Sequence, residues 1–283
     1  MCGFVLIVDD NLKLDIAQKS LDLINHRGPD EQKKIFIDKI FLGFNRLSIQ
    51  DLSSDASQPM KIKDAKNDCY IMFNGEIYNF LDLKKEDLEI KKQNFFSKSD
   101  TEVILRLYTL YGIKKTMNLI QGMYAFTIFD KERKKIFLSR DIFGQKPLYY
   151  YSDSNKFIAA SEIKCITNYI DNIYPSFSGS LNPIFQTGIS PSNKTMFEKI
   201  YKVLPGEIIE FNTLNGVIKK EQHLDLKNLV NENEYNRINK LSQIDLVNEY
   251  NDTLKVALKK HLISDAKSSI ALSMGLDSSL ITS

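Results

Sequence analysis

The stretch GMYAFTIFDKERKKIFLS, residues 122–139, consists of two short apolar runs with charged turn residues between them. Runs of this length that are rich in β-branched and aromatic residues are typical of β-strands. Similar runs occur on both sides of it along residues 1–211, namely GFVLIV, KIFLGF, CYIMFN, PLYYY, KFIAAS and EIIEFN. The sequence therefore predicts a first domain made largely of strands.

Helical spacing occurs in two places between these runs. One predicted helix has apolar residues three or four positions apart on one face, namely Leu14, Ala17, Leu21 and Ile24. The second lies in DTEVILRLYTLYG, with Asp100 as its N-cap and Gly112 as its end. Strand runs with few interleaved helices favour an α+β sandwich over a regular alternation of strands and helices.

The character of the chain changes after residue 211. Residues 212–243 become polar and lose their apolar periodicity, which predicts a linker. Residues 244–265 predict a helix, and SSIALSMGLDSS, residues 268–279, predicts a strand that runs into a loop of small residues. Since one helix and one strand cannot build a core, we expect residues 244–283 to be the start of a second, incomplete domain.

The composition of the 283-residue chain narrows the functional classes. Its 38 basic and 36 acidic residues give a net charge of +2, which argues against nucleic-acid and membrane partners. No stretch approaches the roughly 20 apolar residues of a membrane span. The three cysteines are far apart and odd in number, so we expect no disulfide framework and a cytoplasmic location. Three scattered histidines give little support for a metal site.

Cys2 becomes chemically special if Met1 is removed, because one carbon then carries both a thiol and a free amine. Their reference pKa values are about 8.5 and about 7.7–8.0, so the amine can accept the thiol proton at small cost. Gly3 would let the backbone approach a substrate closely. From position alone, the alternative is that Cys2 is a small apolar residue that opens a buried strand.

Three further positions allow either a structural or a functional role. Asn74-Gly75 after an apolar strand can be a hairpin turn, or can present an amide and a backbone N–H to an oxyanion. Arg46 can clamp a carboxylate or make a structural ion pair. Asp100 can cap a helix, bind a substrate ammonium, or do both.

Ten motifs follow one another along nearly the whole chain, namely MCG, HRGPD, RLSIQDLS, SDASQPM, NGEIYN, SDTEVIL, GMYAF, RDIFGQKPLYY, ASEIK and LPGE. In this order they resemble the class II glutamine amidotransferases, and specifically the glutamine-hydrolysing asparagine synthetase family. The resemblance implies an N-terminal-nucleophile fold, an αββα sandwich, in a glutaminase domain at residues 2–211. It also implies a linker at residues 212–243 and the start of an α/β ATP-pyrophosphatase domain at residues 244–283.

The resemblance implies a role for each residue of the first site. Cys2 is the nucleophile that attacks the side-chain amide of L-glutamine, and its own amine is the base. The Asn74 side chain and the Gly75 N–H form the oxyanion hole. The products of the attack are a glutamyl thioester and ammonia.

Substrate recognition is implied by the same resemblance. Arg46 holds the α-carboxylate of glutamine, Asp100 holds its α-ammonium, and Glu76 lies behind the ammonium site. Anchoring both ends of a zwitterion explains selectivity, since each charged hydrogen bond contributes about 1.5–3 kcal/mol. No metal is expected in this site.

A second motif, IALSMGLDSS, resembles the pyrophosphate loop Ser-Gly-Gly-x-Asp-Ser of ATP-dependent synthetases. The matching residues are Ser273, Gly275, Asp277, Ser278 and Ser279. Met274 replaces the first glycine, which is tolerable if its φ stays negative and its side chain points away. The resemblance implies that ATP with Mg²⁺ adenylates L-aspartate in the full-length protein, and it allows a homodimer. We expect the chain as given to support only the glutaminase half.

Two alternatives to an asparagine synthetase stay open at this point. A related glutamine-dependent enzyme would amidate another carboxylate, such as a cell-surface sugar acid. A catalytically inactive scaffold would keep the domain only to recruit a partner. Amination of a sugar phosphate is disfavoured, because that architecture has no pyrophosphate loop.

Overall fold

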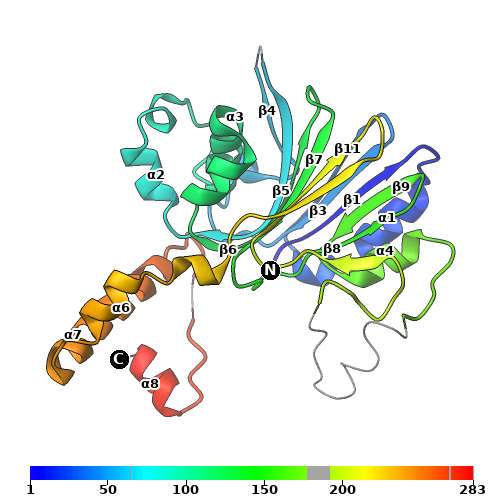
Figure 1. Cartoon of the computed structure of the whole chain (residues 1–283). Coiled ribbons are helices and arrows are strands. Elements are labelled where there is room, and N and C mark those ends of the chain that lie inside the picture. The colour runs from blue at the N-terminus through cyan, green and yellow to red at the C-terminus, as the bar shows by residue number, and fades with distance from the viewer. Residues whose placement is uncertain (65, 177–191, 268, 283) are drawn as a thin grey trace.

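The computed structural model describes residues 1–64, 66–176, 192–267 and 269–282, and two six-stranded antiparallel sheets form its centre (Figure 1). The first sheet has the order β10-β8-β9-β1-β3-β2, with β1 (Gly3–Asp9), β2 (Glu31–Ile37), β3 (Ile40–Arg46), β8 (Tyr149–Ser152), β9 (Lys156–Ala160) and β10 (Ile200–Lys202). The second has the order β12-β11-β7-β6-β5-β4, with β4 (Met60–Lys63), β5 (Asp68–Ile77), β6 (Gly122–Asp130), β7 (Lys135–Arg140), β11 (Glu207–Asn212) and β12 (Ile218–Gln222).

Helices cover the outer faces of the two sheets. Helices α1 (Leu14–Asp22) and α4 (Ile163–Tyr169) pack on the first sheet, and α2 (Phe80–Glu86) and α3 (Asp100–Leu119) pack on the second. Strand β1 is buried on both faces, because Phe4 and Leu6 face the other sheet whereas Val5 and Ile7 face α1 and α4. The structure confirms the predicted αββα layering.

The strands predicted in the first domain are confirmed, since the quoted runs become β1, β3, β5, β6, β7, β8, β9 and β11. The strands that the sequence analysis did not predict are short or charged. Strand β2, for example, reads EQKKIFI and has mostly exposed side chains, as expected at the edge of a sheet. An edge strand of this kind carries no apolar run by which it can be recognised.

Helix α3 corrects two details of the prediction. Its N-cap is Ser99 rather than Asp100, because the Ser99 Oγ accepts a hydrogen bond from the Thr101 N–H at 3.1 Å. It does not end at Gly112, which takes a left-handed φ of 77° and kinks the helix. The helix continues to Leu119, since residues beyond the kink, such as Met117, are buried against the second sheet.

The stretch 212–243, expected to be a linker, contains regular structure. Strand β12 pairs with β11 along its whole length and extends the second sheet. Its sequence IKKEQ leaves most side chains exposed at the sheet edge, so it has no apolar periodicity. After it, the chain forms α6 (Glu232–Ile238). The polar composition therefore reflects an exposed position and not an absence of structure.

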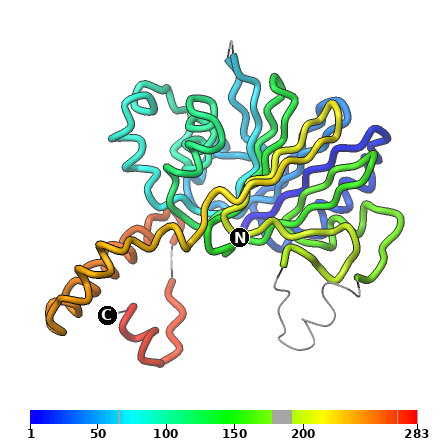
Figure 2. The backbone as a smooth tube through the Cα atoms, in the orientation of Figure 1, coloured from blue at the N-terminus to red at the C-terminus, as the bar shows by residue number. Residues whose placement is uncertain are grey.

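The C-terminal part leaves the sheets along α6 and returns along α7 (Gln243–His261), as Figure 2 shows. Arg237 of α6 forms an ion pair with Glu249 of α7. The His261 ring lies against the ring of Tyr78, which directly follows β5, with 4.0 Å between the ring centres. Helix α7 confirms the predicted helix. None of the helices in the described ranges is long and apolar enough to cross a membrane.

The strand predicted at the start of IALSMGLDSS is wrong. Residues 269–273 have no strand structure, and the loop of small residues continues into helix α8 (Leu276–Thr282). A strand requires a partner to satisfy its backbone hydrogen bonds. No strand among the described residues lies alongside this segment.

Candidate active site

One cavity contains all six residues that the sequence assigned to glutamine chemistry. It has a volume of about 530 Å³ including its open mouth, and its lining includes Cys2, Arg46, Asn74, Gly75, Glu76 and Asp100. Cys2 directly precedes β1, and Arg46 ends β3. The other residues lie in the last four positions of β5 and in the first turn of α3. The fold therefore brings together four segments that are far apart in the sequence.

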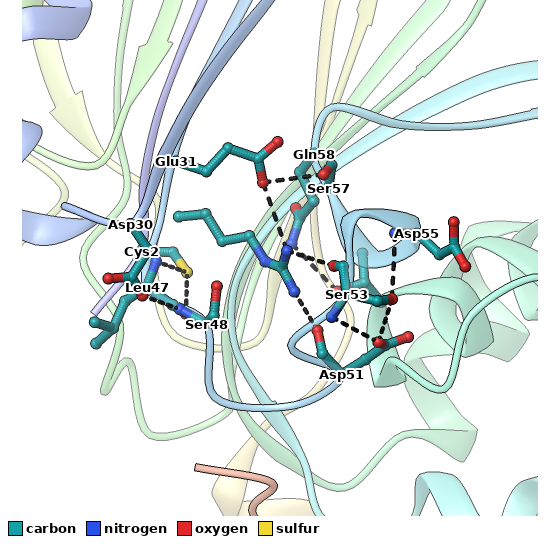
Figure 3. A network of polar contacts seen from close by, with 12 residues as sticks. Cys2, Asp30, Glu31, Leu47, Ser48, Asp51, Ser53, Asp55, Ser57 and Gln58 are labelled. Atoms are coloured by element: carbon teal, nitrogen blue, oxygen red, sulfur yellow. Dashed lines mark hydrogen bonds and ion pairs between the residues drawn. The ribbon is translucent and has the colours of Figure 1, made fainter.

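The pairing of β1 with β3 places Cys2 beside the end of β3, because Gly3 lies opposite Asn45 in the register. The Cys2 Sγ accepts a hydrogen bond from the Leu47 N–H at 3.4 Å, and the Leu47 carbonyl lies 3.5 Å from it (Figure 3). The Arg27 Nε donates to the Cys2 carbonyl at 2.9 Å. Burial raises the pKa of the Cys2 thiol, so the group needs a base to become a nucleophile.

The Asn74 side chain points between the two sheets, because it follows Tyr70 and Met72 on the same face of β5. Its amide nitrogen Nδ2 is buried and has no hydrogen-bond partner among the described residues. A buried, unpaired donor of this kind carries a desolvation cost of about 1–3 kcal/mol. That donor is therefore available to an oxygen atom that enters the cavity.

Gly75 supplies a second donor at the open edge of β5. The Phe73 N–H donates to the Gln58 side chain at 2.7 Å, and the Ile77 N–H donates to the Asp100 Oδ2 at 2.9 Å. Since alternate residues of a strand direct their N–H groups to the same edge, the Gly75 N–H points the same way, between these two contacts. Strand β4 ends its pairing with β5 at Ile71, so this edge is not covered by a strand.

The backbone at this position requires glycine. A Cβ atom added at Gly75 would lie 2.1 Å from the Met123 carbonyl oxygen of the neighbouring strand β6. Asn74 and Gly75 are neighbours in the wall of the cavity that Cys2 also lines. Two preorganised donors next to a nucleophile are the parts of an oxyanion hole.

Asp100 is fully enclosed at the start of α3. Its carboxylate accepts hydrogen bonds from the Ile77 N–H and from the Ser99 hydroxyl, the latter at 3.4 Å. Burial raises the pKa of this carboxyl to about 7, and the nearby Glu76 carboxylate adds to the effect. Burial also raises the pKa of Glu76. Two carboxyl groups that are costly to ionise form a favourable site for a cation.

Arg46 lies buried at the cavity wall and is held in place by the loop that follows β3. Its Nη1 donates to the Ser53 carbonyl at 2.8 Å and lies 3.5 Å from the Glu31 carboxylate, and its Nη2 donates to the Asp51 carbonyl. The structural role that the sequence allowed for Arg46 is therefore present. A guanidinium has five N–H donors in a fixed plane, so these contacts do not exhaust it.

Sequence reasoning missed Lys146, which also lines the cavity. It is only 8% exposed, its Nζ lies 3.5 Å from the Met1 sulfur, and burial lowers its pKa. Burial lowers the pKa of the Met1 α-amine, and the positive charges of Arg27 and Lys146 lower it further. The signal was present in the quoted motif RDIFGQKPLYY, where a lysine stands before an apolar strand.

The residues matched to a pyrophosphate loop lie elsewhere, on an exposed segment. The Ser273 and Ser278 hydroxyls lie 3.0 Å apart, and the Ser278 hydroxyl donates to the Gly275 carbonyl. Asp277 and Ser279 belong to the exposed helix α8. The condition of a negative φ at Met274 is not met, because its φ is 64°, a conformation that favours the glycine it replaces. Its side chain does point away and is 84% exposed.

Comparisons with known proteins agree with this geometry. A family model described as "Glutamine amidotransferase domain" matches residues 1–222. The "Putative asparagine synthetase [glutamine-hydrolyzing] 2" of Methanocaldococcus jannaschii is 34% identical over 99% of this chain and 56% of its own length. The "Asparagine synthetase [glutamine-hydrolyzing] 2" of Bacillus subtilis is 31% identical over 99% of this chain and 38% of its own length.

Among solved structures, the glutamine phosphoribosylpyrophosphate amidotransferase from Bacillus subtilis has a similar fold. The TM-score is 0.57 at 20% identity, over 79% of this chain and 49% of that one. The chain thus spans about half or less of the length of these relatives. Because the family model covers well over half of the chain, the chain belongs to the family of glutamine amidotransferase domains.

Proposed function

We propose that this chain hydrolyses glutamine to glutamate and ammonia through a thioester on Cys2. The observation that carries the proposal is a pair of donors in the cavity that the Cys2 thiol lines, namely the unpaired Asn74 amide nitrogen and the Gly75 N–H on the edge of β5 that no described strand covers. Donors placed where negative charge develops stabilise a tetrahedral intermediate. A cysteine that only filled space would not require a buried, unpaired amide donor beside it.

The base in this mechanism is the α-amine of Cys2 after removal of Met1. It takes the thiol proton, and the thiolate attacks the side-chain carbonyl carbon of glutamine. The carbonyl oxygen becomes an oxyanion held by Asn74 and Gly75. When the C–N bond breaks, the ammonium of Cys2 returns the proton to the leaving nitrogen, which departs as ammonia. Water then attacks the thioester and releases glutamate.

Recognition of the zwitterionic end of glutamine is proposed for three residues. Arg46 presents a guanidinium already fixed by the loop after β3, and a carboxylate accepts hydrogen bonds from it in a bidentate manner. Asp100 and Glu76 line the same cavity and offer carboxylate acceptors for the α-ammonium. A bound ammonium would lower the raised pKa of Asp100 and keep it ionised.

For the whole protein, we propose an asparagine synthetase with a glutaminase domain at 2–211, a linker at 212–243 and the start of an ATP-pyrophosphatase domain at 244–283. Support comes from the names of the relatives that match across the chain. The matched loop offers hydroxyl and carboxylate oxygens, and such donors suit phosphate and Mg²⁺. These belong to Ser273, Asp277, Ser278 and Ser279, with Gly275 in the turn. ATP with Mg²⁺ would activate the aspartate carboxylate that ammonia then attacks.

Ammonia release from glutamine tests the glutaminase proposal. Cys2→Ala should abolish it, since no other group in the cavity can form the thioester, while the circular dichroism spectrum stays unchanged. Cys165→Ala is the matched control, because Cys165 is a buried cysteine on α4, on the opposite side of the first sheet from the cavity. Full activity of Cys2→Ala would contradict the mechanism. No activity in the unchanged protein would favour the inactive scaffold.

A further inference from the structure

The segment that follows α7 returns to the wall of the glutamine cavity. The Asp265 carboxylate accepts a hydrogen bond from the Asp51 N–H at 2.7 Å. The Asp265 and Ala266 N–H groups both donate to the Ile49 carbonyl, at 3.0 and 3.2 Å. These contacts lie beyond residue 222, where the match to the amidotransferase family ends. A part of the chain outside the family domain therefore contacts the loop that follows Arg46.

Side chains on either side of Asp265 hold this segment in place. The His261 ring at the end of α7 lies against Tyr78, with 4.0 Å between the ring centres. Ile263 packs against the hydrophobic core between α3 and the second sheet. A second cavity, next to the segment, is lined by Ile263 and Asp265 and also by Gln50, which lines the glutamine cavity as well. The segment is thus docked by packing as well as by hydrogen bonds.

The loop that receives Asp265 has a backbone conformation that needs support. Asp51 has a φ of 51°, which is uncommon for a residue with a side chain. Its own carboxylate accepts hydrogen bonds from the Ser53 hydroxyl at 2.6 Å and from the Lys98 N–H at 2.7 Å. Such conformations persist when surrounding contacts over-determine them. The Asp265 carboxylate is one of those contacts.

The same loop holds Arg46. The Asp51 carbonyl accepts from the Arg46 Nη2, and the Ser53 carbonyl accepts from its Nη1. A continuous path of hydrogen bonds therefore runs from the Asp265 carboxylate to the Asp51 N–H, and from the Asp51 carbonyl to the guanidinium. A shift of the loop moves both carbonyls that orient Arg46.

We infer that Asp265 is a positioning residue for glutamine binding, which acts through the loop 49–53 on Arg46. The inference rests on the proposed function of Arg46. It assigns part of the glutamine site to the segment after α7, outside the amidotransferase domain. Any change in the position of that segment should then alter the affinity for glutamine.

The test is a comparison of steady-state glutamine hydrolysis by the full chain and its Asp265→Ala variant. The KM for glutamine should rise about fivefold or more, because a charge-assisted hydrogen bond to the loop is lost. The kcat should stay within about twofold, since Cys2, Asn74 and Gly75 are untouched. Asp265→Asn keeps an oxygen acceptor and should give an intermediate KM. Asp252→Ala, an exposed carboxylate on α7, is the matched control and should behave as the unchanged protein.

A double-mutant cycle separates positioning from a general loss of structure. In an Arg46→Ala background, Asp265→Ala should produce no further rise in KM, because the group on which it acts is gone. Additive effects, or an unchanged KM in Asp265→Ala alone, would overturn the inference. Failure of the unchanged protein to release ammonia would instead overturn the proposed function, so the two failures are distinguishable.

Discussion

The two regions that carry chemical motifs differ in how the molecule builds them. The six predicted residues of the cavity at Cys2 come from four segments, and Arg46, Asn74 and Asp100 in its wall are buried. In the segment around Gly275, the side-chain contacts are between neighbours in sequence, and the residues are exposed. Both motifs are recognisable in the sequence. Only the first is an assembled site in the described structure. A motif therefore identifies the chemical groups, whereas burial among several segments fixes their positions relative to one another.

The largest effect of a substitution in the Cys2 cavity is expected on kcat, at the oxyanion hole. Asn74→Ala removes a donor that is used when charge develops on the substrate oxygen, so kcat should fall by about 10²-fold or more. The KM should change little, because the ground-state carbonyl needs this donor less. Steady-state ammonia release measures both constants. A variant that changes only KM would remove Asn74 from the oxyanion hole.

The next effect concerns substrate binding. Arg46→Ala removes a charged contact to the α-carboxylate that is common to ground and transition states, so the KM should rise by about 10-fold or more. Because the Arg46 side chain also holds the loop at Asp51 and Ser53, some loss of thermal stability should accompany it. An unchanged KM for glutamine would move the carboxylate site elsewhere.

A pair of glycine substitutions compares the two regions directly. Gly75→Ala should lower the free energy of unfolding by about 1–3 kcal/mol or more, since its Cβ would lie 2.1 Å from the Met123 carbonyl oxygen. Gly275→Ala should change it by less than about 0.5 kcal/mol, because the nearest atom is the Ser273 hydroxyl oxygen at 3.5 Å. Thermal unfolding of the two variants measures the contrast. Equal losses would mean that the second region is as tightly packed as the first.

The last prediction is a pH dependence of the stability of the free protein that comes from Asp100. Burial raises the pKa of this carboxyl from 3.8 to about 7. Between these values the unfolded state releases the proton and the native state keeps it, so stability should fall as the pH rises. Asp100→Asn should abolish this part of the fall. Thermal midpoints of both proteins across this pH range test it, and identical curves would contradict the assignment.

The sequence predicted the parts of this structure that local patterns encode. Apolar runs located the strands around the core, and ordered motifs located Cys2, Asn74 and Asp100, which the fold brings to one cavity. Local patterns could not show that α3 continues beyond Gly112, because that depends on the burial of Met117 against the second sheet.

Two long-range contacts at or near the site could not be predicted for a similar reason. Lys146 contacts Met1 in the cavity wall across 145 positions of the sequence, and Asp265 contacts the loop that holds Arg46 across 214 positions. The prediction of a strand at residues 269–273 is wrong because here a local pattern is present and, among the described strands, the long-range partner is not. An apolar run favours a strand, but a strand forms only where a partner is present, and none of the described strands lies beside it.

The most direct test of the central claim is an intact-mass measurement before and after treatment with diazo-oxo-norleucine, an electrophile that mimics glutamine. The account predicts the mass of the chain without Met1, followed by one covalent adduct that maps to Cys2. That result would mean that position 2 has become the reactive N-terminus. A chain that retains Met1 and gains no adduct would contradict the account, because the base would then be blocked by a peptide bond.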